Sequence, residues 1–190
     1  MKRAAVCIGV AKTGGGLPTL KVARKGAEDM HAWALAAGID SHLITDAAGP
    51  VTVDQIRKKI KELLAPSNLD QLIIFFSGHG LNVRREEYWL LTGAPEDDEA
   101  VNVAGAEVRA RFCGVPHVVF LSDACRTAPP DTQGQSIEAS PIFPNPDSDG
   151  PENPVDLFWA CTLGAPSHED RKSTRLNSSH DIPSRMPSSA

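Results

Sequence analysis

One histidine and one cysteine, each placed directly after an apolar segment, are the residues best suited to chemistry. Residues 72–76 are apolar and lead through Ser77 and Gly78 to His79, and residues 118–121 lead through Asp123 to Cys125. Both apolar runs are typical of buried parallel strands, whose carboxyl ends meet at one edge of an open α/β sheet, where ligands bind. A histidine and a cysteine delivered to that edge could act together as base and nucleophile, which is the arrangement of a cysteine hydrolase.

The rest of the chain predicts the scaffold that would hold these two residues. We expect an α/β fold of three layers, a mostly parallel sheet flanked by helices, because strand and helix patterns alternate along the sequence. Strands are predicted at 4–10, 42–44, 71–76, 117–121 and 157–162, with a hairpin arm at 88–92, and helices at 20–37, 53–64 and 103–112. Residues 12–17 form a glycine-rich loop, and residues 127–154, rich in Pro, Asp, Ser and Gly, are predicted to form a long loop.

Two of the helices carry further signals. Val22, Met30, Trp33 and Leu35 supply the apolar positions of helix 20–37, in which Gly26 is a weak point and after which Gly38 is a suitable terminator. Helix 53–64 is preceded by Thr52, with Gln55 three residues later, as in a capping box, and its apolar face is formed by the residues Val53, Ile56, Ile60, Leu63 and Leu64.

The last segment, residues 170–190, has no apolar periodicity and ends in Ser and Ala. Its simplest interpretation is a disordered tail. We favour a second one, because codons for 170–180 and 184–190 can be written to match a sequencing adapter at compatible spacing. Residues 170–190 are then a translated artefact to be set aside, and the fold is incomplete at its C-terminus after Glu169.

Composition excludes several classes of function. The chain has a formal net charge of −5, and the tail carries four basic and two acidic residues, so residues 1–169 have a net charge of −7. With no basic stripe, nucleic-acid binding is not expected, and no apolar run is long enough to span a bilayer. The start of the chain is interpreted as a buried strand rather than a signal peptide. The four cysteines show no Cys-x-x-Cys pair, which favours reduced thiols in the cytoplasm.

At this point the sequence resembles the caspase-fold cysteine peptidases, specifically the metacaspase-like and bacterial caspase-like members. The resemblance rests on Phe76-Ser77-Gly78-His79-Gly80 and Asp123-Ala124-Cys125-Arg126, in that order and with His79 and Cys125 46 positions apart. It extends more faintly to residues 157–162, which look like the first strand of the small subunit. Residues 1–169 are therefore expected to form one caspase-like peptidase domain, containing the large subunit and the start of the small one.

Site roles follow from this resemblance together with general chemistry. Cys125 is expected to be the nucleophile and His79 the base that activates it, while the backbone N–H groups of Gly80 and Cys125 form an oxyanion hole. The resemblance also implies that Asp123, two residues before the nucleophile, lies at the floor of the pocket for the residue N-terminal to the cleaved bond (P1) and pairs there with Arg or Lys. An Asp that caps the strand end is the alternative interpretation.

The expected function is that of a cysteine endopeptidase with a His–Cys dyad that cleaves a protein or peptide after Arg or Lys. The alternative is a non-catalytic caspase-like scaffold or decoy module. Loop 127–154 contains Asp131, Asp147 and Asp149 but no Lys or Arg, so an enzyme with a basic P1 preference cannot cut it. We expect no resident metal or cofactor. The acidic residues 96–99 are interpreted as a solvated loop, with Ca²⁺ binding as the alternative. No membrane partner is expected, and fusion partners could follow downstream.

Overall fold

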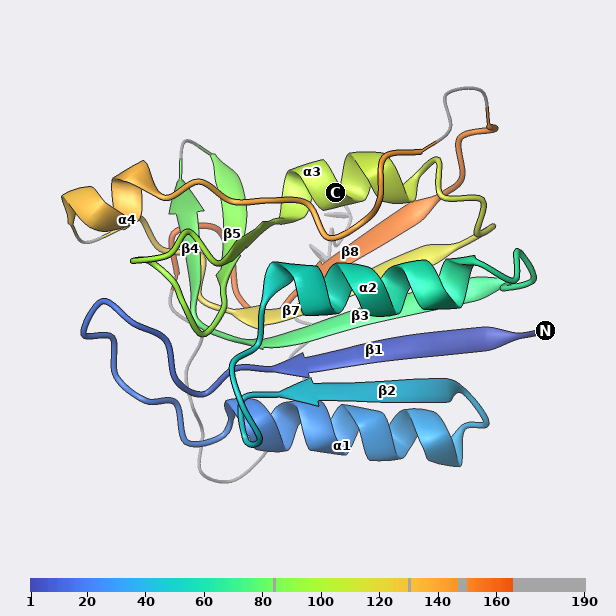
Figure 1. Ribbon diagram of the computed structural model, residues 1–190, viewed down its shortest axis with the longest axis horizontal. Helices are drawn as coiled ribbons and strands as arrows, with labels where there is room; N and C mark the ends of the chain where they lie inside the picture. The colour runs from blue at the N-terminus through green and yellow to red at the C-terminus, as the bar shows by residue number, and fades with distance from the viewer. Residues whose placement is uncertain (84, 130, 147–149, 166–190) are drawn as a thin grey trace, which may run out of the picture.

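A five-stranded parallel sheet forms the centre of the computed structural model, which describes residues 1–83, 85–129, 131–146 and 150–165 (Figure 1). The strand order is β2-β1-β3-β7-β8, and all four neighbouring pairs are parallel. The bounds are β1 Arg3–Gly9, α1 Ala23–Ala36, β2 Asp40–Thr45, α2 Val53–Leu64, β3 Gln71–Gly78, β4 Gly80–Val83, β5 Glu86–Leu90, β6 Ala100–Asn102, α3 Val103–Ala110, β7 Val118–Ala124, α4 Thr132–Ser136 and β8 Val155–Trp159. The predicted parallel sheet is therefore confirmed, with each predicted strand within a few residues of its observed bounds.

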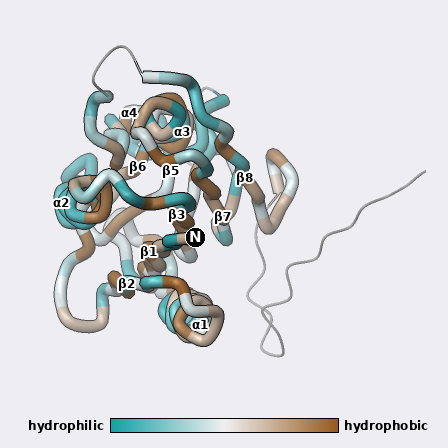
Figure 2. The backbone as a smooth tube through the Cα atoms, turned by 90° about the vertical axis from the view of Figure 1, so that its right-hand side faces the viewer, coloured by the Kyte–Doolittle hydropathy of each residue, from teal (hydrophilic) through white to brown (hydrophobic). Residues whose placement is uncertain are grey.

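Helices cover both faces of this sheet. Helix α1 lies on one face, and α2 and α3 lie on the other, as the view along the strands shows (Figure 2). Strand β3, which precedes His79, is buried on both sides: Phe75, on the face toward α1, is 6% exposed, and Phe76, on the opposite face, is fully buried. Strand β7, which precedes Cys125, is buried on the face toward α2 and α3 and partly buried on the other. Because both faces are apolar, the continuously apolar runs of the sequence are explained, and the predicted three-layer α/β architecture is confirmed.

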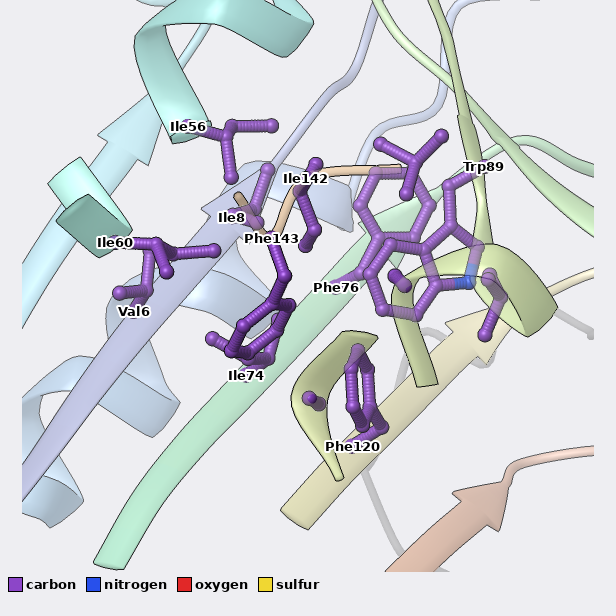
Figure 3. Packing of buried hydrophobic residues seen from close by; sticks show 14 of the residues in the cluster. Val6, Ile8, Ile56, Ile60, Ile74, Phe76, Trp89, Phe120, Ile142 and Phe143 are labelled. Carbon is purple, nitrogen blue, oxygen red and sulfur yellow. The ribbon is translucent and has the colours of Figure 1, made fainter. Parts of the chain in front are cut away.

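An aromatic cluster fills the larger of the two layers of core. The rings of Phe76 and Trp89 stack with centroids 4.8 Å apart and planes inclined by 5°, and Phe120 packs 6.2 Å from Trp89 and 5.9 Å from Phe143 (Figure 3). Trp89 belongs to β5 and Phe143 to the segment after α4, so this cluster joins elements outside the sheet to β3 and β7. Stacked and tilted aromatic pairs are favourable beyond the area they bury.

Helix α1 packs differently from the expectation. Trp33 and Leu35, predicted to face the core, are 54% and 53% exposed, whereas the buried positions are small: Ala23, Gly26, Ala27 and Ala34. The helix approaches the sheet so closely that a Cβ atom added at Gly9 would lie 2.8 Å from the Cβ of Ala27. Small residues permit this approach, so Gly26 is a packing residue rather than a weak point. The predicted terminator is confirmed, since Gly38 has a φ of +69°.

Helix α2 agrees with the sequence pattern. The side chain of Thr52 accepts a hydrogen bond from the backbone N–H of Gln55 at 3.2 Å, which satisfies one otherwise unpaired N–H of the first turn. Val53, Ile56 and Ile60 are buried against the sheet, as predicted.

A second, antiparallel sheet of order β4-β5-β6 follows directly after β3. It lies near the carboxyl ends of the parallel strands, together with α4 and the loop between β1 and α1 (Figure 1). Only the β5 arm was predicted, and β4 and β6 were missed. The predicted long loop 127–154 also proves partly structured, because it contains α4 and two residues of the core, Ile142 and Phe143.

Candidate active site

His79 and Cys125 lie at equivalent positions on neighbouring strands. The last residue pair of the parallel β3–β7 ladder is Gly78 with Ala124, so each reactive residue comes directly after that pair. Beyond them, Leu81 forms a parallel bridge with Thr127, whose carbonyl accepts the N–H of Asn82 at 2.8 Å. Backbone pairing on both sides of the two residues brings them together at the carboxyl edge of the sheet.

The imidazole of His79 is oriented by a backbone carbonyl. Its Nε2 atom lies 2.7 Å from the carbonyl oxygen of Pro18, in the loop between β1 and α1. A carbonyl can only accept, so Nε2 must carry the proton in this contact. In the neutral ring, Nδ1 is then unprotonated and able to take a proton from a thiol.

Gly80 makes the closest backbone approach at this edge. A Cβ atom added there would lie 2.4 Å from the carbonyl oxygen of Cys125 and 2.8 Å from the Cβ of Ala124. Any larger residue would therefore separate the segment after His79 from the segment that carries Cys125. The requirement for glycine here is one of space between two backbones.

Asp123 lies on the α1 side of the sheet, paired in register with Ser77. The Ser77 hydroxyl donates a hydrogen bond to Oδ2 of Asp123 at 3.1 Å, and the Asp123 side chain is partly buried. Asp123 is the second-last residue of β7 and precedes Cys125 by two residues along the chain. A Cβ atom added at Gly26 of α1 would lie 3.9 Å from Oδ2 of Asp123, in ordinary van der Waals contact.

The loop that carries Pro18 is anchored by Asp46, which follows β2 at the same edge. The Asp46 carboxylate accepts the backbone N–H of Ala11 at 3.1 Å and that of Lys12 at 2.8 Å, and Nε of Arg24 lies 2.6 Å away. Its side chain is only 3% exposed. Burial alone raises the pKa of the Asp46 carboxyl, but the hydrogen bonds from Arg24 and from the two amides outweigh it and hold the pKa below its ordinary value.

The acidic segment 96–99 uses its carboxylates to hold other parts of the backbone. Glu96 accepts the N–H of Gly15, Glu99 accepts that of Val53 at 2.8 Å, and Asp98 accepts that of Glu138 at 2.9 Å. These three side chains therefore tie three separate segments to one loop. Within the described residues, no group of three or more His, Cys, Asp or Glu side chains is arranged to hold a metal ion.

Burial affects the thiols of the three other cysteines. Burial raises the pKa of the thiols of Cys7, Cys113 and Cys161, which disfavours their reactive thiolate forms. Cys161 is near Cys125, because its Sγ lies 3.3 Å from the carbonyl oxygen of Ala124, and the charge of Cys125 also raises its pKa. None of the four cysteines forms a disulfide bond.

Three residues at this edge were not singled out from the sequence: Pro18, Asp46 and Glu87, whose contacts are described below. Asp46 could have been found, because it follows a predicted strand just as His79 and Cys125 do. Pro18 contributes its backbone carbonyl, which every residue has. The residue type at this position therefore gave no indication of the contact with His79. In the part of the chain that the structure describes, no helix has the length and apolar character needed to cross a membrane.

An α/β fold that presents a histidine and a cysteine on neighbouring parallel strands is the framework of a cysteine hydrolase. The chain belongs to the family of the caspase domain, peptidase C14, whose sequence profile matches residues 2–180. The resemblance seen in the sequence is thereby confirmed at the level of the family, which is one of cysteine peptidases.

Solved structures of similar fold include one from a bacterium. It is the crystal structure of protein GSU0716 from Geobacter sulfurreducens, with 24% sequence identity and a TM-score of 0.51. The similarity covers 68% of the present chain and 52% of that protein, so the chain matches about half of its length. No curated protein matches the sequence.

Proposed function

We propose that this protein is a cysteine endopeptidase in which Cys125 is the nucleophile and His79 the general acid and base. The observation that carries this proposal is the His79 ring, whose Nε2 is occupied by the Pro18 carbonyl at the point where β3 and β7 bring His79 and Cys125 together. That contact supports a neutral tautomer with Nδ1 free to accept the thiol proton.

The proposed reaction then runs in two stages. Nδ1 of His79 takes the thiol proton, the Cys125 thiolate attacks the peptide carbonyl carbon, and the imidazolium returns the proton to the leaving amine, which leaves a thioester. Nδ1 next takes a proton from water, the hydroxide attacks the thioester, and the thiol is re-formed as the carboxylic product departs. The carbonyl of Pro18 keeps the ring in one orientation through both stages.

The backbone N–H groups of Gly80 and Cys125 are proposed to stabilise the oxyanion of each tetrahedral intermediate. The close approach of Gly80 to the Cys125 backbone supports this pairing, since it keeps both amides at one edge of the sheet. Preorganised donors of this kind typically contribute a factor of roughly 10²–10³ in rate. All of the groups in this mechanism come from the protein, so we expect activity without added Ca²⁺ and in the presence of a chelator.

Cleavage after Arg or Lys is proposed from Asp123. Asp123 lies in β7 two residues before Cys125, so its carboxylate is set back from the nucleophile, a position suited to a long basic side chain whose carbonyl is at the nucleophile. The Ser77 hydroxyl donates to one oxygen of this carboxylate, and a carboxylate is the group with which Arg and Lys side chains pair best. The substrate is therefore proposed to be a protein or peptide with a basic residue before the cleaved bond, and cysteines without disulfide bonds suit a reducing cytoplasm.

The test is a panel of fluorogenic peptides with Arg, Lys or Asp at P1, assayed with the wild type, Cys125→Ala and Asp123→Asn. We expect cleavage after Arg and Lys, none above background by Cys125→Ala, and at least a roughly 100-fold lower kcat/KM for Asp123→Asn, since a desolvated charged hydrogen bond is worth several kcal/mol. Cys113→Ala, at a thiol remote from the site, is the matched control and should keep full activity. Equal signal from the wild type and Cys125→Ala would contradict the proposal and favour a non-catalytic scaffold or decoy.

A further inference from the structure

A buried carboxylate lies beside the proposed nucleophile without taking part in the chemistry described above. Glu87, on β5, is 6% exposed although it is charged. Its Oε1 accepts the hydroxyl of Ser122 at 2.6 Å and the indole N–H of Trp89 at 3.0 Å. The indole nitrogen of Trp89 also lies 2.9 Å from Ser122 Oγ, so the three side chains form a closed triangle.

The second carboxylate oxygen of Glu87 faces Arg126. Nε of Arg126 lies 3.0 Å from Oε2, and the Arg126 side chain is 17% exposed. The N–H direction does not meet hydrogen-bond geometry, so the contact is an ion pair held by charge. Ser122 lies three residues before Cys125, and Arg126 lies one residue after it. The Glu87 carboxylate therefore contacts the chain on both sides of the proposed nucleophile.

The same strand also holds the histidine. In the β4–β5 ladder Gly80 is paired with Trp89, and the N–H of Leu90 donates to the carbonyl of His79 at 2.9 Å. Strand β5 thus contacts the backbone at His79 and, through Glu87, the residues flanking Cys125. The stacked Trp89 ring fixes the position of β5 against β3 (Figure 3).

Arg126 extends this connection to the last strand of the sheet. Its guanidinium carbon lies 4.4 Å from the centroid of the Trp159 ring, at the end of β8, within the range of a cation–π contact. The backbone of Arg126 is held there too, because its N–H donates to Ala165 and its carbonyl accepts the N–H of Gly164. Arg126, the residue after Cys125, therefore contacts both β5 and the segment that follows β8.

We propose that Glu87 is a positioning residue for peptide cleavage: its carboxylate fixes the segment around Cys125 relative to His79 and, through Arg126, links that segment to Trp159. This inference rests on the proposed function, since it assumes that Cys125 and His79 are the reacting groups. A charged pair suits this task better than an apolar contact, because hydrogen bonds and ion pairs specify one geometry whereas apolar side chains repack. Neither Glu87 nor Arg126 needs to touch the substrate.

The experiment compares Glu87→Gln, the double variant Glu87→Gln/Arg126→Gln and, as matched control, Glu107→Gln. Glu107 forms a 2.6 Å ion pair with Arg111 on α3, away from the site. Each variant is measured for kcat and KM well below its Tm, and for the rate at which iodoacetamide alkylates Cys125 at pH 7, followed by mass spectrometry with Cys7 as internal control.

We expect Glu87→Gln to lower kcat roughly 10- to 100-fold with KM within about threefold, the range for a displaced catalytic group. Alkylation of Cys125 should meanwhile become at least about threefold faster, because the segment is loosened and the Arg126 charge, no longer balanced, favours the thiolate. The double variant restores neutrality and should recover part of kcat, and Glu107→Gln should match the wild type. A purely structural role would instead lower Tm alone or expose Cys7 to alkylation as well.

A Glu87→Gln protein with kcat and Cys125 alkylation within twofold of the wild type would overturn the proposal. If Glu87→Gln does not fold, Ser122→Ala is measured in its place, because it keeps the charges of Glu87 and Arg126 and removes one hydrogen-bond donor to Glu87 Oε1. A kcat of Ser122→Ala within twofold of the wild type would equally overturn the proposal. A wild-type protein that cleaves no peptide would contradict the proposed function only, and the alkylation rates would still decide whether Glu87 positions Cys125.

Discussion

Replacing Asp46 by Asn tests whether the loop that orients His79 is held by one buried carboxylate. The carboxylate accepts two backbone amides and the Arg24 side chain, whereas an Asn side chain offers one acceptor and turns an N–H₂ group toward the remaining donors. A hydrogen bond to a buried charged group contributes about 1.5–3 kcal/mol. With one acceptor retained and the half-exposed Arg24 discounted, we expect the free energy of unfolding to fall by about 2–4 kcal/mol. For a chain of this size, that corresponds to a Tm lower by roughly 4–16 °C.

The pH dependence of this loss follows from the lowered pKa of Asp46. A carboxyl whose pKa is lower in the folded state stabilises the fold fully above its ordinary value of 3.8, and this stabilisation is lost as pH falls through the lower, folded value. The Tm difference between the wild type and Asp46→Asn should therefore be constant from about pH 7 to pH 5 and shrink below about pH 4.

Calorimetry at pH 7, 5 and 3, together with kcat for a P1-Arg peptide, measures both consequences. We also expect kcat to fall roughly tenfold, because the Pro18 carbonyl is no longer fixed relative to His79. Glu62→Gln is the matched control: its pair with Lys59 is on the exposed surface of α2, so its Tm should not change measurably. An Asp46→Asn protein whose Tm at pH 7 equals that of the wild type would refute the reasoning.

Three further substitutions test close contacts near the site. Gly80→Ala should abolish peptide cleavage, because the new Cβ would lie 2.4 Å from the Cys125 carbonyl oxygen, and activity within tenfold of the wild type would contradict this. Gly9→Ala should lower stability to urea by about 1–3 kcal/mol, because its Cβ would lie 2.8 Å from that of Ala27. Glu96→Gln should leave Tm within a few degrees but increase hydrogen exchange at the amides of the β1–α1 loop, and unchanged exchange would show that Glu96 does not hold this loop.

The sequence was sufficient for the parallel sheet because each of its strands carries a strong local signal. Residues 72–76 and 118–121 are continuously apolar, which is typical of parallel strands with helices on both faces of the sheet. Parallel strands place their carboxyl ends at one edge of the sheet, so the two strand assignments were enough to predict that the residues after them share that edge. The family match and the observed strand order both agree with it.

Helix α1 was predicted in place but wrongly oriented, for a physical reason. The buried face of the helix was predicted from its large apolar residues. Close contact between α1 and β1 requires small residues instead, and Trp33 and Leu35 remain exposed. The same limit affected loop 127–154, where Ile142 and Phe143 enter the core without any periodic neighbours. Isolated core residues of this kind depend on tertiary contacts, which no local pattern encodes. The interpretation of residues 170–190, and of Asp147 and Asp149 as part of the linker, concerns residues outside those described.

The two halves of the site depend on different parts of the molecule. The β3–β7 ladder fixes the depth at which His79 and Cys125 leave the sheet, but it sets neither the rotation of the imidazole nor the side-chain contacts on either side of Cys125. Those are set by the Pro18 carbonyl and by Glu87, which belong to segments with few sequence signals. Substitutions in the ladder should therefore reduce stability and activity together, whereas substitutions at Asp46 or Glu87 should reduce kcat by more than the loss of folded protein explains.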